Sequence, residues 1–352
     1  PNRERLAAAL EREYAGYLSR EEQRQHTARI RSIVTDQFDG LAGTLTGLSE
    51  RSCGITPCTE GLTRRITEGL LAAERELREV LCWTSSGGHL TVRLAFPAAL
   101  PQRVDAEKLG KLIAAEAGLE MEGPTRSRQE GVLLLTYREK PRYRLEHWQY
   151  QLPAVENTPC GDTLRDVRGE EGLQALILSD GMGTGAAAAL DSAMLCNLVG
   201  RLLEAGIPCG SALRLVNSAL MVKGGRETLA TLDAAAVDCY TGSAAFYKAG
   251  AAPTFLRRQG RAMRLEAVSL PAGILDGVEP VKRRFALREE DLLLMVSDGV
   301  PTEEPWVEEQ LTAWEGDDPA ELCRRIAEAA RLRCRETRPD DITVAALRLV
   351  RQ

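Results

Sequence analysis

Apolar and polar positions in the second half of the chain predict two buried strands that each end in a carboxylate. The apolar runs are Leu173–Leu178 and Leu292–Val296, and each has the length and composition of a buried strand. They continue into the same tripeptide, Ser179-Asp180-Gly181 and Ser297-Asp298-Gly299. A glycine behind such an aspartate lets the backbone approach an ion closely. The pattern therefore predicts two aspartates fixed in position at strand ends.

Around these runs the pattern predicts helices and further strands in an irregular order. Helices are expected over 186–205, 211–221 and 319–334, where apolar residues recur at helical spacing. The other expected strands cover 230–238, 244–249, 254–258, 262–267 and 342–347. Strands, two helices, strands, helix and strand do not form a regular alternation of single strands and helices. We therefore predict an α+β fold for the domain at 153–352.

The first part of the chain predicts helices. Residues 2–48 have helical character, and a seam of apolar residues steps through Val34, Phe38, Leu41, Leu45 and Leu48. This seam would either pack on the chain's own core, pair two subunits as a homodimer, or dock on the catalytic domain. A second helix is expected over 62–81, so 1–84 is predicted to be a helical regulatory or dimerisation segment.

A small α/β regulatory domain is expected over 85–152. Strands are predicted at 89–96, 131–137 and 143–150, and a helix at 105–117. This segment has no catalytic constellation, and the proline-containing stretch 151–159 is expected to be the linker that follows it.

Composition narrows the classes of function. The chain has 352 residues, of which 44% are hydrophobic and 27% charged, with a net charge of −6. No basic cluster interleaved with aromatic residues occurs, which argues against a nucleic acid as the main partner. No apolar run is long enough to be expected to span a bilayer, and no signal peptide is evident. Because the chain begins with Pro1, we expect it to be part of a longer protein.

Cysteine and histidine usage argues against several kinds of site. The nine cysteines are scattered without a C-x-x-C pair, which favours reduced thiols in the cytosol over disulfides or a zinc site. The three histidines, His26, His89 and His147, lie far from the acidic motifs. Zinc chemistry and Ser-His-Asp catalysis therefore lack most of their components.

Two further aspartates are expected beside the first two. Asp162 follows Gly161 and is predicted to lie in a hairpin opposite Asp180, and Asp340 precedes the last strand. If these carboxylates converge with Asp298, like charges about 4 Å apart repel by roughly 4 kcal/mol at an effective dielectric of 20. A cation is then required, and an all-oxygen ligand set selects Mg²⁺, Mn²⁺ or Ca²⁺. No EF-hand loop is present, and two hard ions sharing Asp180 would suit hydrolysis of a phosphate ester by a metal-bound water.

These motifs resemble those of a known family. The motifs that carry the resemblance are, in chain order, Gly161-Asp162, Ser179-Asp180-Gly181-Met182-Gly183-Thr184-Gly185, Thr231-Leu232-Asp233, Leu270-Pro271-Ala272-Gly273-Ile274, Ser297-Asp298-Gly299 and Asp340-Asp341-Ile342-Thr343-Val344. They are similar to motifs of the metal-dependent Ser/Thr protein phosphatases, the protein phosphatase 2C-like superfamily, and within it of the stage II sporulation protein E branch. The resemblance covers 161–350.

The resemblance implies an α-β-β-α sandwich with two Mn²⁺ or Mg²⁺ ions at one edge of its central sheets. Asp180 would bridge both ions and the Gly181 carbonyl would bind one of them. Asp298 and Asp340 would complete the other ion's ligands, and Asp162 would act close by, directly or through water.

In three respects the chain departs from relatives in this superfamily. Asp341 takes a position where many relatives have Asn, so we expect it to lie behind the ligands rather than among them. No histidine follows Asp180-Gly181 to protonate a leaving group, and no arginine precedes Asp162 to hold the phosphate. The residue that holds the phosphate is therefore unassigned.

The resemblance also implies a biological setting. Its members dephosphorylate a phosphoserine on an anti-sigma factor antagonist, a small STAS-type protein, in sporulation or sigma-factor control. Full-length relatives carry membrane spans ahead of the region seen here, so this part is expected on the cytoplasmic side, regulated by its N-terminal region.

Two other functions fit parts of the sequence. The spacing of Gly181, Gly183 and Ala186 after a strand matches a dinucleotide-binding fingerprint, but no second strand ending in an acid follows about 20 residues later. A catalytically weak phosphatase fold kept as a scaffold or binding module is the other alternative. The presence of every expected ligand position argues against it.

Overall fold

The computed structural model describes residues 56–352 except 75, 86, 98–103, 130, 170, 224–229, 267–280 and 335–339, and it leaves the side chains of 218–223, 281 and 282 undescribed. The predicted helix at 2–48 and its apolar seam lie outside the described residues, as does the Leu270–Ile274 motif. Backbone contacts divide the chain into two compact units. The first contains Leu145–Val237 and Gly242–Val350. The second contains the described residues up to Arg144, together with Asp238–Thr241 and Arg351–Gln352.

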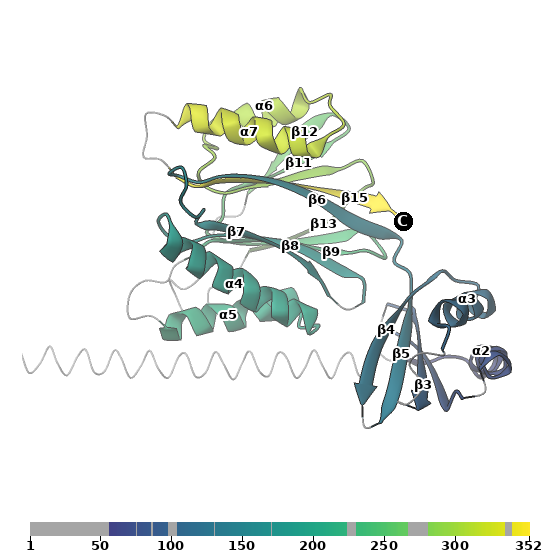
Figure 1. Cartoon of the computed structure of the whole chain (residues 1–352). Coiled ribbons are helices and arrows are strands. Elements are labelled where there is room, and N and C mark those ends of the chain that lie inside the picture. The colour runs from purple at the N-terminus through teal and green to yellow at the C-terminus, as the bar shows by residue number, and fades with distance from the viewer. Residues whose placement is uncertain are drawn as a thin grey trace, which may run out of the picture. The chain divides into compact units, whose positions relative to one another are not determined.

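The first unit is built around two five-stranded sheets (Figure 1). The first sheet has the order β13-β10-β9-β8-β7 and consists of β7 (Asp162–Arg168), β8 (Leu173–Asp180), β9 (Leu232–Asp238), β10 (Ser243–Ala249) and β13 (Val281–Ala286). The second sheet has the order β12-β11-β14-β15-β6 and consists of β6 (Tyr143–Leu152), β11 (Thr254–Arg258), β12 (Arg261–Leu265), β14 (Leu292–Val296) and β15 (Ile342–Arg351).

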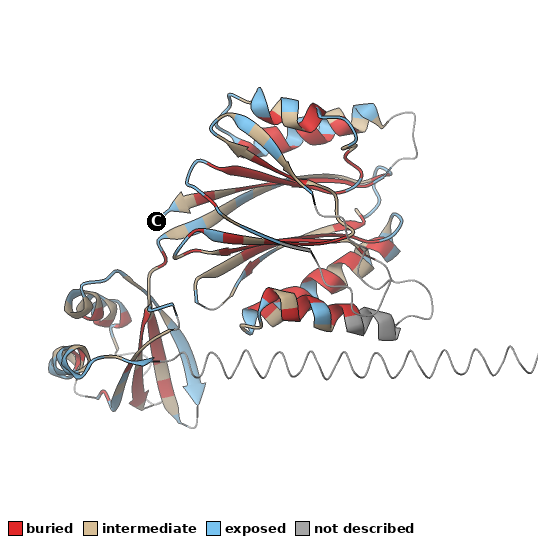
Figure 2. Cartoon of the chain, turned by 180° about the vertical axis from the view of Figure 1, so that it is seen from behind, coloured by how far each residue is buried: buried red, intermediate tan, exposed pale blue. Residues whose placement is uncertain are grey.

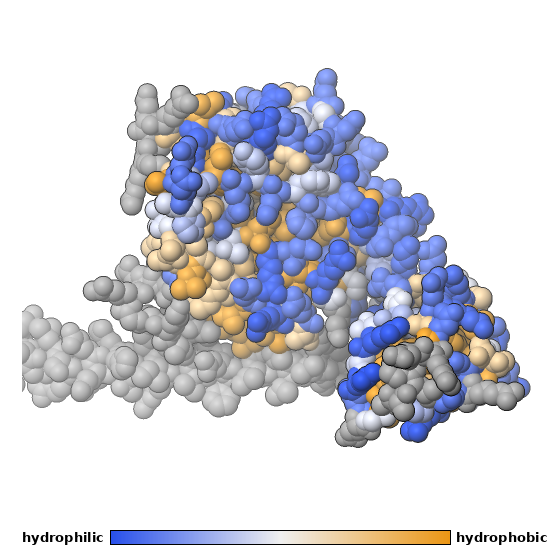
Figure 3. Space-filling model, in the orientation of Figure 1, coloured by the Kyte–Doolittle hydropathy of each residue, from blue (hydrophilic) through white to orange (hydrophobic). Residues whose placement is uncertain are grey.

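A pair of helices covers the outer face of each sheet (Figure 1). The first sheet is covered by α4 (Ala186–Glu204) and α5 (Cys209–Lys223), and the second by α6 (Trp306–Thr312) and α7 (Pro319–Arg333). Helix α7 begins after its N-cap Asp318, whose side chain accepts the Ala320 N–H, and it exposes charged residues that make its surface in Figure 3 largely hydrophilic. The predicted α-β-β-α sandwich is confirmed.

The strands that carry the aspartates are buried on both faces, as their unbroken apolar runs indicated. In β8, Ala175 and Ile177 share a core with α4 and α5, while Leu176 and Leu178, which alternation places on the opposite face, are also buried. Figure 2 shows that much of the two sheets is coloured as buried. β14 repeats the arrangement, with all of its residues buried. Asp180 and Asp298 therefore lie at the ends of strands that are held in place by side-chain packing on both faces.

Two elements of the first unit are absent from the sequence-based prediction. β13 carries three consecutive basic or polar residues, Lys282, Arg283 and Arg284, which hide its strand character. Helix α6 has only 7 residues, too few to establish a helical period.

The second unit is a five-stranded sheet with two helices. Its strands β1 (Thr56–Pro57), β2 (Glu79–Thr84), β3 (Leu90–Pro97), β4 (Met121–Gln129) and β5 (Val132–Glu139) have the order β1-β2-β3-β5-β4. Helices α2 (Glu60–Ala73) and α3 (Ala106–Ala117) share one core with it, built around Ile66, Phe96 and Ile113.

The structure differs from the sequence-based expectation for this part of the chain in four respects. The helix expected over 62–81 ends at Ala73, and Leu81 lies in β2, where the spacing of Leu70, Leu77 and Leu81 only imitates a helical stripe. Strand β4 was not predicted because most of its residues are polar and exposed. Strand β6, expected in the small domain, pairs in the second sheet of the first unit, so the contact boundary lies between Arg144 and Leu145, rather than after Leu152. The described residues before and after the expected boundary at Thr84 belong to one unit.

Helix α4 is long and apolar enough to cross a membrane by length and composition, with a mean hydropathy of 1.3, although the sequence analysis expected no such segment. Its buried residues include Leu195, Cys196 and Val199, which pack into the core beneath the first sheet. We therefore interpret α4 as a core helix of the sandwich.

Candidate active site

Asp162 and Asp180 face each other at the end of the β7–β8 hairpin. The two strands are antiparallel, and Asp162 pairs directly with Asp180 in their register, as the sequence predicted. Directly opposite residues point to the same face of a sheet, with Cβ atoms about 5 Å apart. Two carboxylates are therefore brought together at one edge of the first sheet.

Backbone and hydroxyl groups of Thr231 hold Asp180 in place. The Thr231 N–H donates to the Asp180 carbonyl at 2.8 Å, and the Asp180 N–H donates to Thr231 Oγ1 at 3.1 Å. Ser179 Oγ donates to the Thr231 carbonyl at 2.7 Å. The residue after Asp180 must be glycine because a Cβ on Gly181 would lie 2.1 Å from the Ala188 carbonyl oxygen in the first part of α4. The start of α4 is thus packed directly on the aspartate segment.

The carboxylates of this pair are buried, and three of their four oxygens have no close hydrogen-bond partner. Asp162 is 5% exposed and Asp180 8% exposed, and no partner reaches either oxygen of Asp162 or Oδ1 of Asp180. Burial raises the pKa of Asp162 to about 6, while the nearby hydroxyls of Thr343 and Ser297 act to lower it. Burial, together with the nearby charges of Asp162 and Asp298, raises the pKa of Asp180 to about 10. Without a cation, this pair is electrostatically unfavourable.

Asp298 enters the site from the second sheet. It follows β14 through Ser297, whose Oγ accepts the Thr343 N–H of β15 at 2.8 Å. A Cβ on Gly299 would lie 2.0 Å from the Asp341 carbonyl oxygen, so only glycine allows this turn to approach the start of β15. The Ser297-Asp298-Gly299 segment therefore packs against the start of β15, and these contacts fix the backbone on both sides of Asp298.

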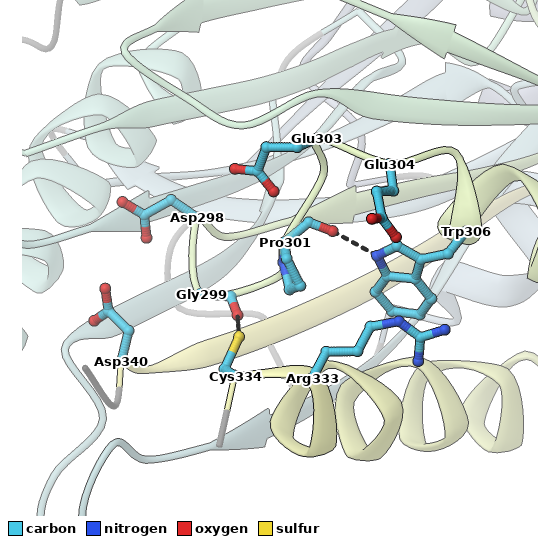
Figure 4. Close-up of a pocket in the computed structure, with 9 residues that line it drawn as sticks. All are labelled: Asp298, Gly299, Pro301, Glu303, Glu304, Trp306, Arg333, Cys334 and Asp340. Atoms are coloured by element: carbon cyan, nitrogen blue, oxygen red, sulfur yellow. Dashed lines mark hydrogen bonds between the residues drawn. The ribbon is translucent and has the colours of Figure 1, made fainter. Parts of the chain in front are cut away.

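Asp340 and Asp298 both line a hollow of about 580 Å³. Figure 4 shows the two carboxylates pointing toward one another at one end of this hollow. Both residues are exposed, in contrast to Asp162 and Asp180. The four predicted aspartates thus form a series. Asp162 faces Asp180, and the charge of Asp298 raises the pKa of Asp180. Asp298 in turn faces Asp340.

Unlike Asp340, Asp341 is buried and uses both carboxylate oxygens to accept backbone hydrogen bonds. Its Oδ1 accepts the Ala154 N–H at 2.7 Å and its Oδ2 accepts the Gly161 N–H at 2.9 Å. Both oxygens are therefore engaged by backbone, and the second of these bonds fixes the residue directly before Asp162. This geometry supports the expectation that Asp341 stands behind the ligands.

The residues fit a hard divalent cation in their chemistry. Carboxylate oxygens and a backbone carbonyl are ligands that Mg²⁺ and Mn²⁺ prefer, and the unpartnered oxygens of Asp162 and Asp180 lack any other compensation. Among the described residues, no three acidic, histidine or cysteine side chains lie close enough to form a complete ligand set. Binding of an ion would therefore require rotation of these side chains.

Apart from Gly299, which belongs to the predicted Ser297-Asp298-Gly299 motif, sequence reasoning did not identify the other residues of the hollow. They are Pro301, Glu303, Glu304, Trp306, Arg333 and Cys334. Trp306 and Arg333 come from α6 and the end of α7, and only the fold brings them beside Asp298. The only sequence signal for them was that Arg333 is a basic residue in the last turn of a predicted helix.

The cysteines and histidines contribute no reactive pair to this site within the described residues. The described cysteines are free thiols, and burial raises the pKa of Cys160, Cys196 and Cys323 to about 12. Thiols of such pKa carry little thiolate at neutral pH. Cys53 and His26 lie outside the described residues.

The dinucleotide-binding alternative is contradicted by the fold. β7 and β8 form an antiparallel hairpin, and β8 is followed by two successive helices on the same face of the sheet. The fingerprint needs a parallel strand–helix–strand unit at this point.

Comparison with known proteins gives the family. A model of the family "Stage II sporulation protein E (SpoIIE)" matches residues 170–350. Stage II sporulation protein E of Bacillus subtilis (strain 168) is 33% identical over 183 residues, covering 50% of this chain and 22% of that protein. The protein of the same name from Priestia megaterium is 31% identical over 196 residues, covering 54% of this chain and 34% of that protein. The chain therefore spans only a minor part of the length of these relatives.

Solved structures agree on the fold. The protein phosphatase 2C domain of SpoIIE from Bacillus subtilis, with a fragment of its regulatory domain, superposes with a TM-score of 0.61 at 22% identity, covering 90% of this chain and 96% of that chain. The RsbU and RsbW domains of a Mycobacterium tuberculosis protein give a TM-score of 0.50 at 22% identity, covering 59% and 62%. The first unit thus has the protein phosphatase 2C fold. Since the family model matches more than half of its residues, the chain belongs to the stage II sporulation protein E family.

Proposed function

We propose that this chain contains the catalytic part of a metal-dependent protein serine/threonine phosphatase. The observation that carries the proposal is the buried Asp162–Asp180 pair, in which three of four oxygens have no close hydrogen-bond partner and Asp180 is affected by the charge of Asp298. A protein retains such an arrangement at a cost in stability, and a bound cation would offset that cost. Membership of the stage II sporulation protein E family supports the same function.

The proposed ligands divide between two ions of Mn²⁺ or Mg²⁺. Asp180 would contact both, the Gly181 carbonyl one of them, and Asp298 and Asp340 the other, with Asp162 adjacent. Bound in this way, the ions would activate water as a nucleophile and neutralise charge on the phosphate.

The chain's own residues provide the positioning. Thr231 makes two hydrogen bonds to the backbone of Asp180, one through its N–H and one through its hydroxyl. Its carbonyl accepts a third bond, from the hydroxyl of Ser179. Asp341 fixes Gly161 and hence the approach of Asp162. Such preorganisation keeps acidic oxygens directed at a site whose occupant carries the opposite charge.

The proposed substrate is a phosphoserine on a STAS-type anti-sigma factor antagonist, in sporulation or sigma-factor control. The resemblance of the motifs supports this choice. The same resemblance supports regulation by the N-terminal region, homodimerisation through the N-terminal helices, and tethering to the membrane by segments outside this sequence, with this part on the cytoplasmic side.

The test is phosphate release from a phosphoserine protein with and without Mn²⁺. We expect release that depends on Mn²⁺ or Mg²⁺ and is lost in Asp180→Asn. Turnover of Asp180→Asn at the wild-type rate would contradict the assignment. Specific binding of the phosphoprotein without release would support the scaffold alternative instead.

A further inference from the structure

An arginine and a tryptophan form the end of the hollow that lies away from the aspartates. Figure 4 shows Asp298 and Asp340 at one end, Arg333 and Trp306 at the other, and Gly299 and Cys334 between them. No metal ligand has been assigned to the Arg333 end. It nevertheless opens into the same hollow, so a ligand held there would lie beside a group bound by the aspartates.

The Arg333 guanidinium is stacked on a fixed aromatic surface. Its Cζ atom lies 4.4 Å from the centroid of the Trp306 ring. Trp306 is 4% exposed and its Nε1–H donates to the Pro301 carbonyl at 2.6 Å, so the ring cannot turn freely. Stacking orders the arginine side chain, which reduces the conformational entropy that a ligand would have to remove.

The guanidinium lies over the ring as a cation–π contact, and the side chain of Arg333 is otherwise exposed. The N–H donors of arginine lie in the plane of the group, where they match the two oxygens of a carboxylate or phosphate. No carboxylate among the described residues lies within ion-pair distance of Arg333, although Arg324 of the same helix pairs with both Glu321 and Glu328. Within the part of the chain that the structure describes, the edge of the exposed Arg333 side chain therefore presents a donor set without a neighbouring counter-charge.

We propose that Arg333, ordered by Trp306, binds a carboxylate side chain of the substrate protein close to its phosphoserine. This inference rests on the proposed phosphatase function and adds to it a residue that selects the substrate. The reacting phosphate itself is assigned to the aspartate end, because Asp298 and Asp340 lie there and the stacked guanidinium does not point at them (Figure 4).

Two acidic residues line the same hollow as Arg333 and weaken its attraction for a carboxylate. Glu303 and Glu304 also line the hollow and would repel an incoming carboxylate. Both are exposed, so water and salt screen their charge, whereas a bidentate bond to the arginine edge is short and directional. We therefore expect a moderate preference for an acidic neighbour of the phosphoserine, on the order of tenfold in kcat/KM.

The experiment uses three probes and the full chain. The probes are para-nitrophenyl phosphate and two phosphoserine peptides that differ only in carrying glutamate or glutamine around the phosphoserine. Wild type is compared with Arg333→Ala, Arg333→Lys and Arg325→Ala, the last being an exposed arginine of the same helix that does not line the hollow. Each protein is assayed with Mn²⁺ for kcat and KM, and peptide dissociation constants are measured by fluorescence anisotropy.

We expect wild type and Arg325→Ala to prefer the glutamate peptide about tenfold, mainly through KM. Arg333→Ala should lose the preference and keep turnover of para-nitrophenyl phosphate, and Arg333→Lys should retain only part of it because lysine lacks the planar fork. A preference that survives in Arg333→Ala would overturn the inference. An equal loss of para-nitrophenyl phosphate turnover would also overturn it, since Arg333 would then hold the reacting phosphate. If no protein turned over any probe, the phosphatase function would fail, and the ratio of peptide dissociation constants would still decide for or against Arg333.

Discussion

Replacing Asp180 by asparagine removes the carboxylate whose surroundings are least favourable, so we expect the metal-free protein to become more stable as it loses activity. The pKa of Asp180 rises from 3.8 to about 10 through burial and the charges of Asp162 and Asp298. At pH 7, this group is ionised in the unfolded chain and protonated in the metal-free fold. One pKa unit corresponds to about 1.4 kcal/mol, so taking up that proton costs up to about 4 kcal/mol of unfolding free energy.

The sign of the pH dependence follows from the raised pKa. A carboxyl whose pKa is higher in the fold than in the unfolded chain favours the fold fully below 3.8, and that contribution is lost as pH rises toward about 10. Between pH 6 and 9, the metal-free wild type should lose up to about 1.4 kcal/mol per pH unit more than Asp180→Asn.

Urea denaturation in a chelator at several pH values measures both effects. Asp166→Asn is the matched control, because Asp166 lies on β7 and is exposed. We expect Asp180→Asn to be more stable than wild type at pH 7 and Asp166→Asn to be unchanged. The reasoning would be refuted if Asp180→Asn were no more stable than wild type and had the same dependence on pH.

Three further predictions test how the fold supports the site. Gly181→Ala should raise the Mn²⁺ concentration needed for half-maximal rate, because its Cβ would meet the Ala188 carbonyl 2.1 Å away; an unchanged metal titration would contradict this. Lys248→Met should lower the unfolding free energy in urea by about 3–5 kcal/mol, because it leaves the buried Asp233, 2.5 Å from Lys248 Nζ, without a counter-charge. Adding Asp233→Asn to that variant should recover part of the loss, and no recovery would count against the pair. A protein beginning at Tyr143, which keeps β6 in the second sheet, should need a several-fold to hundredfold different Mn²⁺ concentration than the full chain, corresponding to a coupling of about 1–3 kcal/mol; identical curves would exclude control by the N-terminal part.

The parts of the fold that were predictable are those in which local pattern and burial agree. β8 and β14 are buried on both faces, so their apolar runs carry a strong signal, and their Asp-Gly ends are fixed by close backbone contacts at Gly181 and Gly299. The pairing of Asp162 with Asp180 was predictable because a short hairpin connects them.

The remaining parts depend on contacts between distant segments. β4 is mostly exposed, so its polar sequence carries no alternating signal, and it is held by pairing with β5. β6 was placed in the wrong sheet because its pattern gives its type but not its partner. Arg333 and Trp306 come from separate helices, and nothing in their local sequence indicates that they share a hollow with Asp298.

The central claim is that the converging aspartates hold divalent cations on which hydrolysis depends. The most direct measurement is a Mn²⁺ titration in which bound metal, followed by electron paramagnetic resonance, and phosphate release from a phosphoserine protein are recorded on the same samples of wild type, Asp180→Asn and Asp166→Asn. We predict that release rises with occupancy in wild type and Asp166→Asn, and that Asp180→Asn loses both tight binding and release. Release that proceeds without bound Mn²⁺ or Mg²⁺, or that persists in Asp180→Asn at the wild-type rate, would contradict the claim.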